Sequence, residues 1–251
     1  MKTILISGCS TGFGNHTARH FLARGWQVVA TMRTPDPERL PRSERLRVLK
    51  LDVTDPDSVR RAAAEAGPID ALVNNAGVGL LSILEGTPED TIRAVFETNL
   101  FGTIALTRAF LPTLRDREGS VIVNVSSSTT LKPLPMLSVY TASKAALNAF
   151  TESLALELEP AGVRVALVVP GQAPGTSFAT NARARMQKRG VSVPEGYAAF
   201  AEKVFERMAG GPAGPHTESQ DVADAIWRAV TEPSSPRRQL AGADAIAAVG
   251  G

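Results

Sequence analysis

The sequence contains one cysteine, Cys9, in 251 residues, so no disulfide can form within the chain. Such scarcity suits the reducing cytoplasm, and we expect a cytoplasmic protein in which Cys9 is a small core residue. Long apolar stretches are also lacking, since none reaches the roughly 18 residues that a membrane-spanning helix needs. The apolar start, residues 1–6, ends too soon for a signal peptide. We therefore expect no membrane span and interpret the start as a strand.

An excess of charge of one sign is lacking as well. The 27 basic and 25 acidic side chains nearly balance, which gives no electrostatic reason to expect nucleic acid or an anionic membrane as a partner. Internal repeats, charge blocks and linkers are also missing. With 43% apolar and 21% charged residues, the composition is that of an ordinary globular protein. We predict a single domain spanning residues 1–251.

Short apolar runs that are typical of buried parallel strands alternate with longer segments of helical character. They lie at Thr3–Ser7, Gln27–Thr31, Arg47–Leu51, Ala71–Asn74, Val121–Val125 and Val163–Val169. Parallel neighbours need crossover connections, which are nearly always right-handed. The pattern therefore predicts an α/β fold: a Rossmann-type, doubly wound parallel sheet of about seven strands, with helices on both faces.

Helix signals agree with this alternation. Thr87-Pro88-Glu89-Asp90 predicts a helix start, with a hydroxyl cap, proline in the first helical position and acidic residues in the first turn. A long helix is expected over Ser138–Glu159, where Pro160 and Gly162 supply the stop. A last helix is expected over Asp221–Val230, followed by a short tail.

The regular pattern changes after Pro170 and Gly171. Glycine, proline and arginine are scattered there between two short helical candidates, Thr180–Lys188 and Tyr197–Met208. We interpret residues 171–215 as an insertion that acts as a lid. Its apolar side chains are candidates either for a wall of the substrate pocket or for the lid's own core.

A glycine-rich loop directly follows the first strand and opens into a helix. Glycines allow the tight turn and let backbone N–H groups and the helix N-terminus approach a pyrophosphate, whose charge the helix dipole favours. The candidate cofactor-binding residues here are Gly8, Ser10, Thr11, Gly12, Phe13 and Gly14. Because the G-x-x-x-G-x-G spacing differs from the common dinucleotide fingerprint, the alternative is a glycine turn needed only for packing.

The end of the second strand indicates which cofactor is bound. An NAD enzyme usually has an acid there for the ribose 2′-hydroxyl, whereas an NADP enzyme offers arginine to the 2′-phosphate. Arg33 stands at that point between Thr31 and Thr34, and a guanidinium fork matches a phosphate. We therefore predict NADP(H). The alternative is that Arg33 is an ordinary solvated cation, and we interpret Asp36 nearby as turn chemistry.

Tyr140 and Lys144 are four residues apart in the long predicted helix, which puts the phenol and the ammonium on one face. A free phenol titrates near about 10, so an ammonium that stabilises phenolate makes Tyr140 a candidate proton-transfer residue near neutrality. Ser127 follows the strand Val121–Val125, where ligand-binding groups gather, and is a candidate to hold a substrate oxygen. Taken singly, each of these motifs also occurs by chance.

In this order, behind a phosphate loop, these segments resemble the short-chain dehydrogenase/reductase family, in its branch of about 250 residues. The resemblance spans most of the chain. Further matching motifs are Asp52, Asn74-Asn75-Ala76-Gly77, Asn99 and Pro170-Gly171. The resemblance implies an NADP(H)-dependent oxidoreductase that interconverts a carbonyl and an alcohol by direct hydride transfer. The Ala-Thr-Met-Arg run is similar to that of retinol and 17β-hydroxysteroid dehydrogenase-like relatives, which hints at a lipophilic substrate.

The resemblance also implies roles for residues at the strand ends. Cofactor contacts are implied for Asp52 and Val53 at the adenine, for Asn75, Ala76 and Gly77 along the cofactor, and for Pro170 and Gly171 beside the nicotinamide. Catalytic roles are implied for Tyr140 in proton transfer, for Lys144 at the nicotinamide ribose and in lowering the Tyr140 pKa, for Ser127 at the carbonyl, and for Asn99 in a water relay. As alternatives, Asp52 is an ordinary cap and the Asn-Asn-Ala-Gly run is a turn.

Asn99 is unfavourable in a helix interior among its apolar neighbours, which predicts a kink with exposed backbone acceptors. The family commonly has threonine four residues after the Pro-Gly pair, whereas here Thr176 comes one position later, so its contact with the cofactor carboxamide stays open. The resemblance further implies a homodimer or homotetramer that uses the helices of Asn99 and Tyr140. Alternatively, their apolar faces belong to the monomer core.

Two other functions stay open. A protein that kept this fold and lost its chemistry would bind NAD(P)H as a sensor, which intact Ser127, Tyr140 and Lys144 argue against. An isomerase or dehydratase of this fold usually has a larger C-terminal domain. His16 and His20 share a helix face, but further ligands are lacking, so we predict no metal site and place both on an exposed or half-buried surface.

Overall fold

The computed structural model describes residues 1–209 and 214–249 and contains a parallel sheet in the strand order β3-β2-β1-β4-β5-β6-β7. The strands are β1 (Thr3–Ile6), β2 (Gln27–Met32), β3 (Leu46–Lys50), β4 (Ala71–Asn74), β5 (Val121–Val125), β6 (Arg164–Pro170) and β7 (Arg238–Ala241). Every neighbouring pair in this order is parallel. The predicted doubly wound α/β fold is confirmed, and six of its strands lie within a residue or two of their predicted positions.

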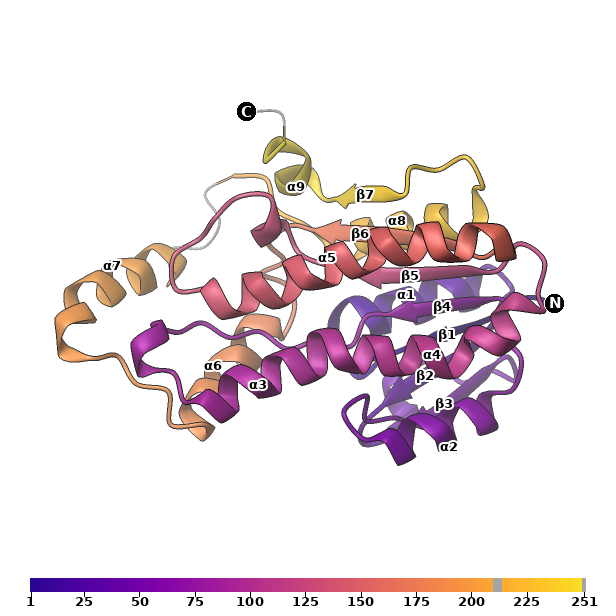
Figure 1. Cartoon of the computed structure of the whole chain (residues 1–251), viewed down its shortest axis with the longest axis horizontal. Helices are drawn as coiled ribbons and strands as arrows, with labels where there is room; N and C mark the ends of the chain where they lie inside the picture. The colour runs from indigo at the N-terminus through magenta and orange to yellow at the C-terminus, as the bar shows by residue number, and fades with distance from the viewer. Residues whose placement is uncertain (210–213, 250–251) are drawn as a thin grey trace.

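Helices connect the strands and cover both faces of the sheet (Figure 1). They are α1 (Gly12–Ala23), α2 (Pro56–Ala66), α3 (Glu89–Phe96), α4 (Gly102–Arg115), α5 (Ser138–Leu158), α6 (Phe178–Lys188), α7 (Ala198–Ala209), α8 (Ser219–Thr231) and α9 (Ala243–Ala247). A π-helical turn, η3 (Glu97–Phe101), joins α3 to α4.

Alternate residues of each strand face opposite sides of the sheet, which divides the core into two layers. Ile4 and Ile6 of β1 pack in the layer under α1 and α8, whereas Leu5 packs in the layer under α2, α4 and α5. Cys9 is fully buried in the first layer and therefore fills core space, as predicted. Among the residues that the structure describes, no helix is long and apolar enough to cross a membrane.

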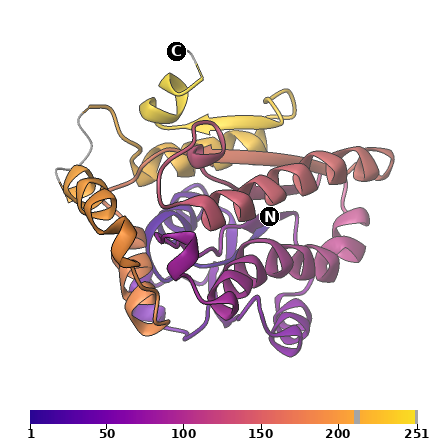
Figure 2. The same ribbon diagram turned by 60° about the vertical axis from the view of Figure 1, so that its left-hand side comes forward.

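Helices α6 and α7 lie together at the side of the sheet where the arrows of β6 and β7 end (Figures 1 and 2). The two helices of the predicted lid are therefore present at the carboxyl edge of the sheet. Of that predicted segment, 171–215, residues 210–213 lie outside the described part of the chain. The carboxyl edge is where ligands bind in doubly wound sheets.

Three local predictions need correction. The tail was expected to follow the last helix directly, but it adds the strand β7, because four residues pair with β6. Thr87 does not cap α3: its hydroxyl donates to the Ile83 carbonyl, and Pro88 takes the cap position. His20 is buried, because it packs between α1 and α8 against Trp227, while His16 is exposed.

Candidate active site

The geometry of the loop after β1 requires its glycines. Gly8 and Gly12 have positive φ angles of 76° and 58°, and a Cβ on Gly14 would overlap the carbonyl oxygen of Gly8. Ser10 and Thr11 are exposed at the N-terminus of α1, whose first turn has neither an acidic residue nor a side-chain cap. The free amide groups there favour an anion. The loop therefore fits the pyrophosphate of a dinucleotide.

Ser7 and Asn75 fix the segment after β4 against this loop. The Ser7 hydroxyl accepts hydrogen bonds from the backbone amides of Asn75 and Ala76, each at 3.0 Å. The Asn75 side-chain amide donates to the Ser7 carbonyl at 2.9 Å. The predicted segment Asn75–Gly77 thus borders the glycine loop. Phe13, also in that loop, is half-buried and packs against the core layer under α1.

Tyr140 and Lys144 lie in the first two turns of α5, and each side chain is only 5% exposed. The Lys144 ammonium donates to the carbonyl of Val125, at the end of β5, over 2.9 Å. Ser127 is half-buried just after β5, and its side chain is close enough to Tyr140 to lower the Tyr140 pKa. The structure therefore brings together the three residues that the sequence singled out.

Burial dominates the electrostatics of this trio. Loss of water raises the pKa of Tyr140 to about 12, although the Ser127 side chain opposes that shift. Loss of water also lowers the pKa of Lys144 to about 8. In the chain by itself, burial therefore moves the Tyr140 pKa in the direction opposite to the lowering that we expected from Lys144. The same burial makes Lys144 a group that exchanges its proton near neutral pH.

Lys144→Met is expected to change how the free energy of unfolding depends on pH. In the unfolded chain Lys144 has its ordinary pKa of 10.5, so above about pH 8 the unfolded state binds more protons than the folded state. Stability from this group therefore rises with pH between those two values. From about pH 7.5 to about pH 9.5, the wild type should gain about 2 kcal/mol relative to Lys144→Met.

Urea unfolding of both proteins at the two pH values measures this difference. Lys132→Met is the matched control, because Lys132 is exposed. An equal pH dependence in wild type and Lys144→Met would mean that the ammonium is not desolvated.

Asn99 lies in the π-helical turn η3 and is fully buried. Its side chain holds the backbone of Val78 on both sides, accepting from the amide at 2.8 Å and donating to the carbonyl at 3.0 Å. The same amide donates to the Ser143 hydroxyl on α5 at 3.0 Å. A Cβ on Gly77 would lie 3.3 Å from the Lys144 ammonium and 3.4 Å from the Asn99 side-chain oxygen. The predicted irregularity at Asn99 therefore places it beside Lys144.

A buried chain of amides and hydroxyls under the site escaped the sequence analysis. The Asn74 amide donates to the Asn124 side-chain oxygen at 2.8 Å, and Asn124 donates to the Thr151 hydroxyl at 2.9 Å. This chain joins β4, β5 and α5 beneath the trio. Its signal in the sequence is an asparagine inside the apolar strand Val121–Val125, because a buried amide needs polar partners.

The residues predicted to bind the adenosine end of the cofactor contact one another less than the residues near Tyr140 do. Arg33 is exposed directly after β2. The Asp52 carboxylate accepts from the amide and hydroxyl of Thr54, at 3.0 and 2.7 Å, as an ordinary turn cap does. Val53 is 9% exposed and packs so closely on α4 that a Cβ on Gly102 would lie 2.7 Å from it. The Asp36 carboxylate accepts from the Glu38 amide, in agreement with turn chemistry.

The segment after β6 reaches across the site. Pro170 ends β6 in register with Ala241 of β7. Thr176 lies against the glycine loop, since its Cβ would be 3.6 Å from a Cβ on Gly12. The Phe178 ring lies 5.7 Å from the Tyr140 ring, centroid to centroid. The turn before α6 therefore lies against the glycine loop, and the first residue of α6 lies against the candidate proton donor.

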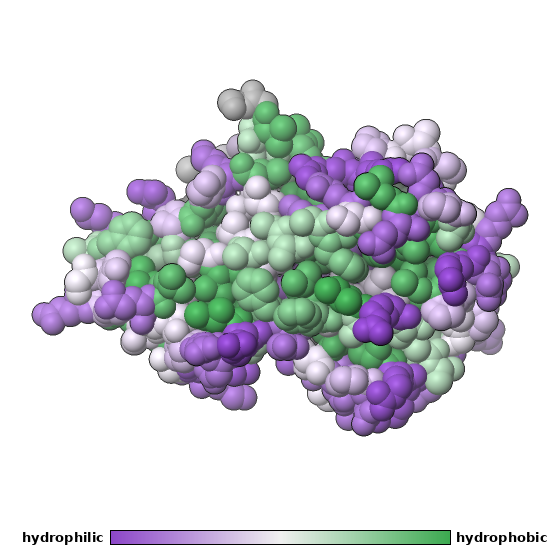
Figure 3. All heavy atoms as spheres, in the orientation of Figure 1, coloured by the Kyte–Doolittle hydropathy of each residue, from purple (hydrophilic) through white to green (hydrophobic). Residues whose placement is uncertain are grey.

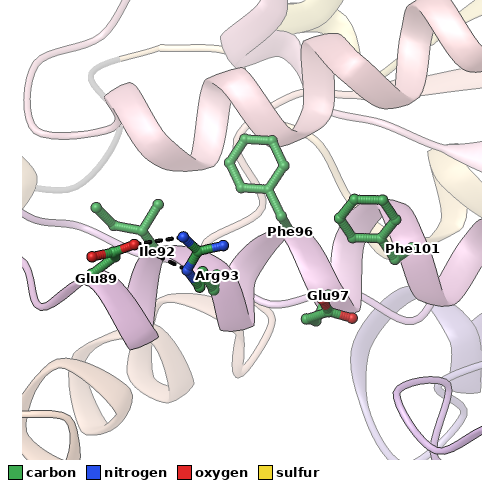
Figure 4. Close-up of a pocket in the computed structure, with 6 residues that line it drawn as sticks. All are labelled: Glu89, Ile92, Arg93, Phe96, Glu97 and Phe101. Atoms are coloured by element: carbon green, nitrogen blue, oxygen red, sulfur yellow. Dashed lines mark hydrogen bonds and ion pairs between the residues drawn. The ribbon is translucent and has the colours of Figure 1, made fainter.

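A separate hollow of about 320 Å³ lies on the outer side of α3 and η3 (Figure 4). It is lined by Glu89, Ile92, Arg93, Phe96, Glu97 and Phe101. Phe96 and Phe101 rise on the same side of the helix in this view, whereas Glu97 points the other way. None of the trio on the carboxyl edge of the sheet lines this hollow, so it is not the place of the chemistry.

The doubly wound sheet and the glycine loop after β1 are those of a dinucleotide-binding fold. The family model for short chain dehydrogenases matches residues 2–187. The chain therefore belongs to the short-chain dehydrogenase family. Members of this family carry out NAD(P)-dependent oxidoreduction of an alcohol or a carbonyl group, and the chain shares this general activity.

Relatives and solved structures agree with this membership. The oxidoreductase YusZ of Bacillus subtilis is 36% identical over 247 residues, covering 92% of this chain and 85% of that protein. Retinol dehydrogenase 8 of Bos taurus is 41% identical over 184 residues, covering 68% of this chain and 58% of that protein. The chain thus aligns with less than two thirds of the length of this vertebrate relative.

Among solved structures, a short-chain dehydrogenase from Streptomyces avermitilis has a TM-score of 0.80 at 33% identity, covering 99% of this chain and 90% of that one. A dehydrogenase from Burkholderia cenocepacia in complex with NADP has a TM-score of 0.77 at 28% identity, covering 98% and 92%. A short-chain dehydrogenase/reductase from Burkholderia phymatum in complex with NAD has a TM-score of 0.79 at 27% identity, covering 96% and 88%. Similar structures thus hold either cofactor.

Proposed function

We propose that the protein is an NADP(H)-dependent oxidoreductase that interconverts a ketone or aldehyde and an alcohol, with Tyr140 as general acid and base. The observation that carries the proposal is the burial of Tyr140 and Lys144 one helical turn apart, with Ser127 next to Tyr140. A buried phenol has no bulk water to exchange its proton with, so its partner in proton transfer is a bound ligand or Lys144.

A nicotinamide cofactor bound at this site would supply the hydride in reduction and accept it in oxidation. In reduction, Tyr140 gives its proton to the carbonyl oxygen, while Ser127 holds that oxygen by a hydrogen bond. In oxidation, the same phenol oxygen takes the proton from the alcohol. Lys144 would bind the nicotinamide ribose and return the proton to Tyr140. Asn99 would position the water that connects this exchange to solvent. The pKa of Lys144, about 8, suits that exchange.

Two cations support NADP(H) over NAD(H). Arg33 is exposed at the end of β2. Burial lowers the pKa of Arg185 in α6, and the charges of Arg33 and Arg189 lower it further, so Arg185 and Arg33 are near enough to interact. Neighbouring guanidinium groups repel each other and favour a nearby anion, such as a 2′-phosphate. The remaining cofactor contacts that we propose are those of Gly8, residues 10–14, Asp52, Val53, residues 75–77, Pro170 and Gly171.

The substrate that we propose is a lipophilic carbonyl or alcohol. The Phe178 ring beside Tyr140 supplies an apolar surface at the reacting group, and residues 171–215 would act as the lid that excludes water. The names of the relatives retinol dehydrogenase 8 and estradiol 17-beta-dehydrogenase 2 agree with such a substrate. A single, buried cysteine supports a reducing, cytoplasmic location.

The test is the consumption of NADPH and of NADH at 340 nm with a panel of aromatic ketones, aldehydes and steroids. Turnover with NADPH in preference to NADH supports the proposal. Tight NADPH binding without turnover of any carbonyl would instead favour an NAD(P)H-binding sensor. Turnover with NADH in preference to NADPH would contradict the roles given to Arg33 and Arg185.

We also propose that the protein forms a homodimer or homotetramer through the outer sides of η3, α4 and α5. Figure 3 shows apolar side chains gathered over this face, where Phe101 is 51% and Leu156 is 64% exposed. The double variant Phe101→Glu and Leu156→Glu should lower the mass measured by sedimentation to that of the monomer. Leu84→Glu, at an exposed leucine outside these helices, is the control. A wild-type monomer would contradict the assembly.

A further inference from the structure

The first residues after β6 and the last residues before α8 lie side by side. We call Gly171, Gln172 and Thr217 the neck of the segment between β6 and α8. The Thr217 backbone amide donates to the Gln172 carbonyl at 2.9 Å, so the two ends are directly joined. The Gly171 amide donates to the carbonyl of Ala241, the last residue of β7, at 3.1 Å. The neck is thus held against the C-terminal part of the chain.

One carboxylate fastens both sides of the neck. Asp244 lies in the first turn of α9, and one of its oxygens accepts from the Gln172 backbone amide at 2.5 Å. The other oxygen lies 2.6 Å from the Thr217 hydroxyl, whose single proton it shares as acceptor with the Ala241 carbonyl at 3.0 Å. Both oxygens of a half-buried carboxylate are therefore used, one on each strand of the neck. Charge-assisted hydrogen bonds of this kind are stronger than those between neutral groups.

The backbone around the neck is shaped to admit this carboxylate. A Cβ on Gly171 would overlap the Asp244 side chain, so glycine is needed there for close approach. Gly242 has a φ of 95°, and a Cβ on it would overlap Thr217. Gly171 is also the residue for which we propose a place beside the nicotinamide. The contact between the C-terminal tail and the neck therefore includes a residue that we place at the nicotinamide end of the site.

The neck is followed directly by the residues of the segment that contact the candidate active site. Only a few residues beyond Gln172, Thr176 packs beside Gly12, and the Phe178 ring packs on the Tyr140 ring at 5.7 Å. A shift of the neck would carry both contacts with it. Because a displacement of about 1 Å can cost a large factor in rate, the position of the neck bears on the chemistry.

We propose that Asp244 is a positioning residue, which fixes the neck and so holds Gly171 and the first turn of α6 in the geometry that closes over the cofactor. The inference rests on the proposed function, since it assumes that a nicotinamide cofactor lies against Gly171. Asp244 acts through Gln172 and Thr217 and does not touch the reacting atoms. The C-terminal tail is thereby a working part of the site.

The experiment compares wild type, Asp244→Ala, Asp244→Asn and Thr217→Val in limited trypsin digestion and in NADPH titration by fluorescence. Exposed Arg183 and Lys188 report opening of α6, and Arg238 reports release of β7. In Asp244→Ala, cleavage in α6 should become about tenfold faster without cofactor, and the dissociation constant for NADPH should rise about tenfold. Thr217→Val and Asp244→Asn, which keep part of the clamp, should show smaller changes.

Asp116→Ala, at an exposed aspartate after α4, is the matched control and should leave both readouts unchanged. Faster cleavage at Arg238 alone, or an unchanged NADPH dissociation constant in Asp244→Ala, would overturn the inference and leave Asp244 as an anchor of the tail. Equally faster cleavage at all trypsin sites, together with a lower midpoint of unfolding, would also overturn the inference. If wild type fails to bind NADPH, the proposed function fails, while digestion without cofactor still tests the clamp.

Discussion

Tyr140→Phe is expected to lower kcat for carbonyl reduction by about a thousandfold, while the dissociation constant for NADPH stays within a factor of about two. General acid–base catalysis by a positioned side chain is typically worth about a hundredfold to ten-thousandfold. The substitution removes the proton donor and keeps the ring, including its packing on Phe178. The loss should therefore appear in turnover and not in cofactor binding. Steady-state kinetics at saturating NADPH measures the first quantity, and fluorescence titration measures the second.

The chain has only two tyrosines, which offers a closely matched control. Tyr197→Phe makes the same chemical change at a 39% exposed residue ahead of α7, and it should keep turnover within a factor of about two of wild type. Comparable losses in both variants would mean that Tyr140 is not the proton donor. Retained turnover in Tyr140→Phe would mean the same, and would direct attention to Ser127 or a bound water.

Arg33→Asp is expected to reverse the preference between the two cofactors. Hydrogen bonds to charged groups contribute about 1.5–3 kcal/mol, so the dissociation constant for NADPH should rise by roughly ten- to a hundredfold. The introduced carboxylate also repels the 2′-phosphate and can accept hydrogen bonds from a ribose 2′-hydroxyl. NADH should consequently bind as well as before or better. Fluorescence titrations with both cofactors give the ratio directly.

Arg45→Asp is the control for the change of charge. Arg45 is exposed just before β3, at the amino edge of the sheet and so at the opposite end from Arg33. Its replacement should shift both cofactors equally and by little, because separated surface charges are screened by salt. A similar loss of NADPH affinity in both variants would assign the effect to net charge. An unchanged ratio in Arg33→Asp would leave Arg33 as a solvated surface cation.

The alternation of apolar runs and helical segments was sufficient to predict the sheet, because a strand that is buried on both faces consists of consecutive apolar residues. The sequence of strand β7 is not such an apolar run. Its residues Arg238 and Gln239 are polar, and it becomes a strand only by pairing with β6 at the sheet edge. The cap of α3 was also predicted wrongly, because the Thr87 hydroxyl donates to the Ile83 carbonyl in the preceding turn and not to the helix.

The phosphate loop and the trio could be predicted because each is a local pattern at a strand end or on a helix face. Their electrostatics could not, because a pKa depends on burial that only the tertiary structure sets. For Tyr140 burial reverses the expected direction of the shift. The Asp244 clamp joins residues 72 positions apart, and no local pattern marks it. Contacts of this range are fixed by the path of the whole chain.

The most direct test of the account is to follow the hydride itself. Wild-type protein would be incubated with NADPH deuterated at C4 of the nicotinamide and a carbonyl from the panel that is turned over, and the alcohol would be analysed by mass spectrometry. Direct transfer predicts one deuterium on the carbinol carbon, with loss of the label from the cofactor. An alcohol that carries no deuterium with either C4-labelled form of NADPH would contradict direct hydride transfer and with it the proposed oxidoreductase.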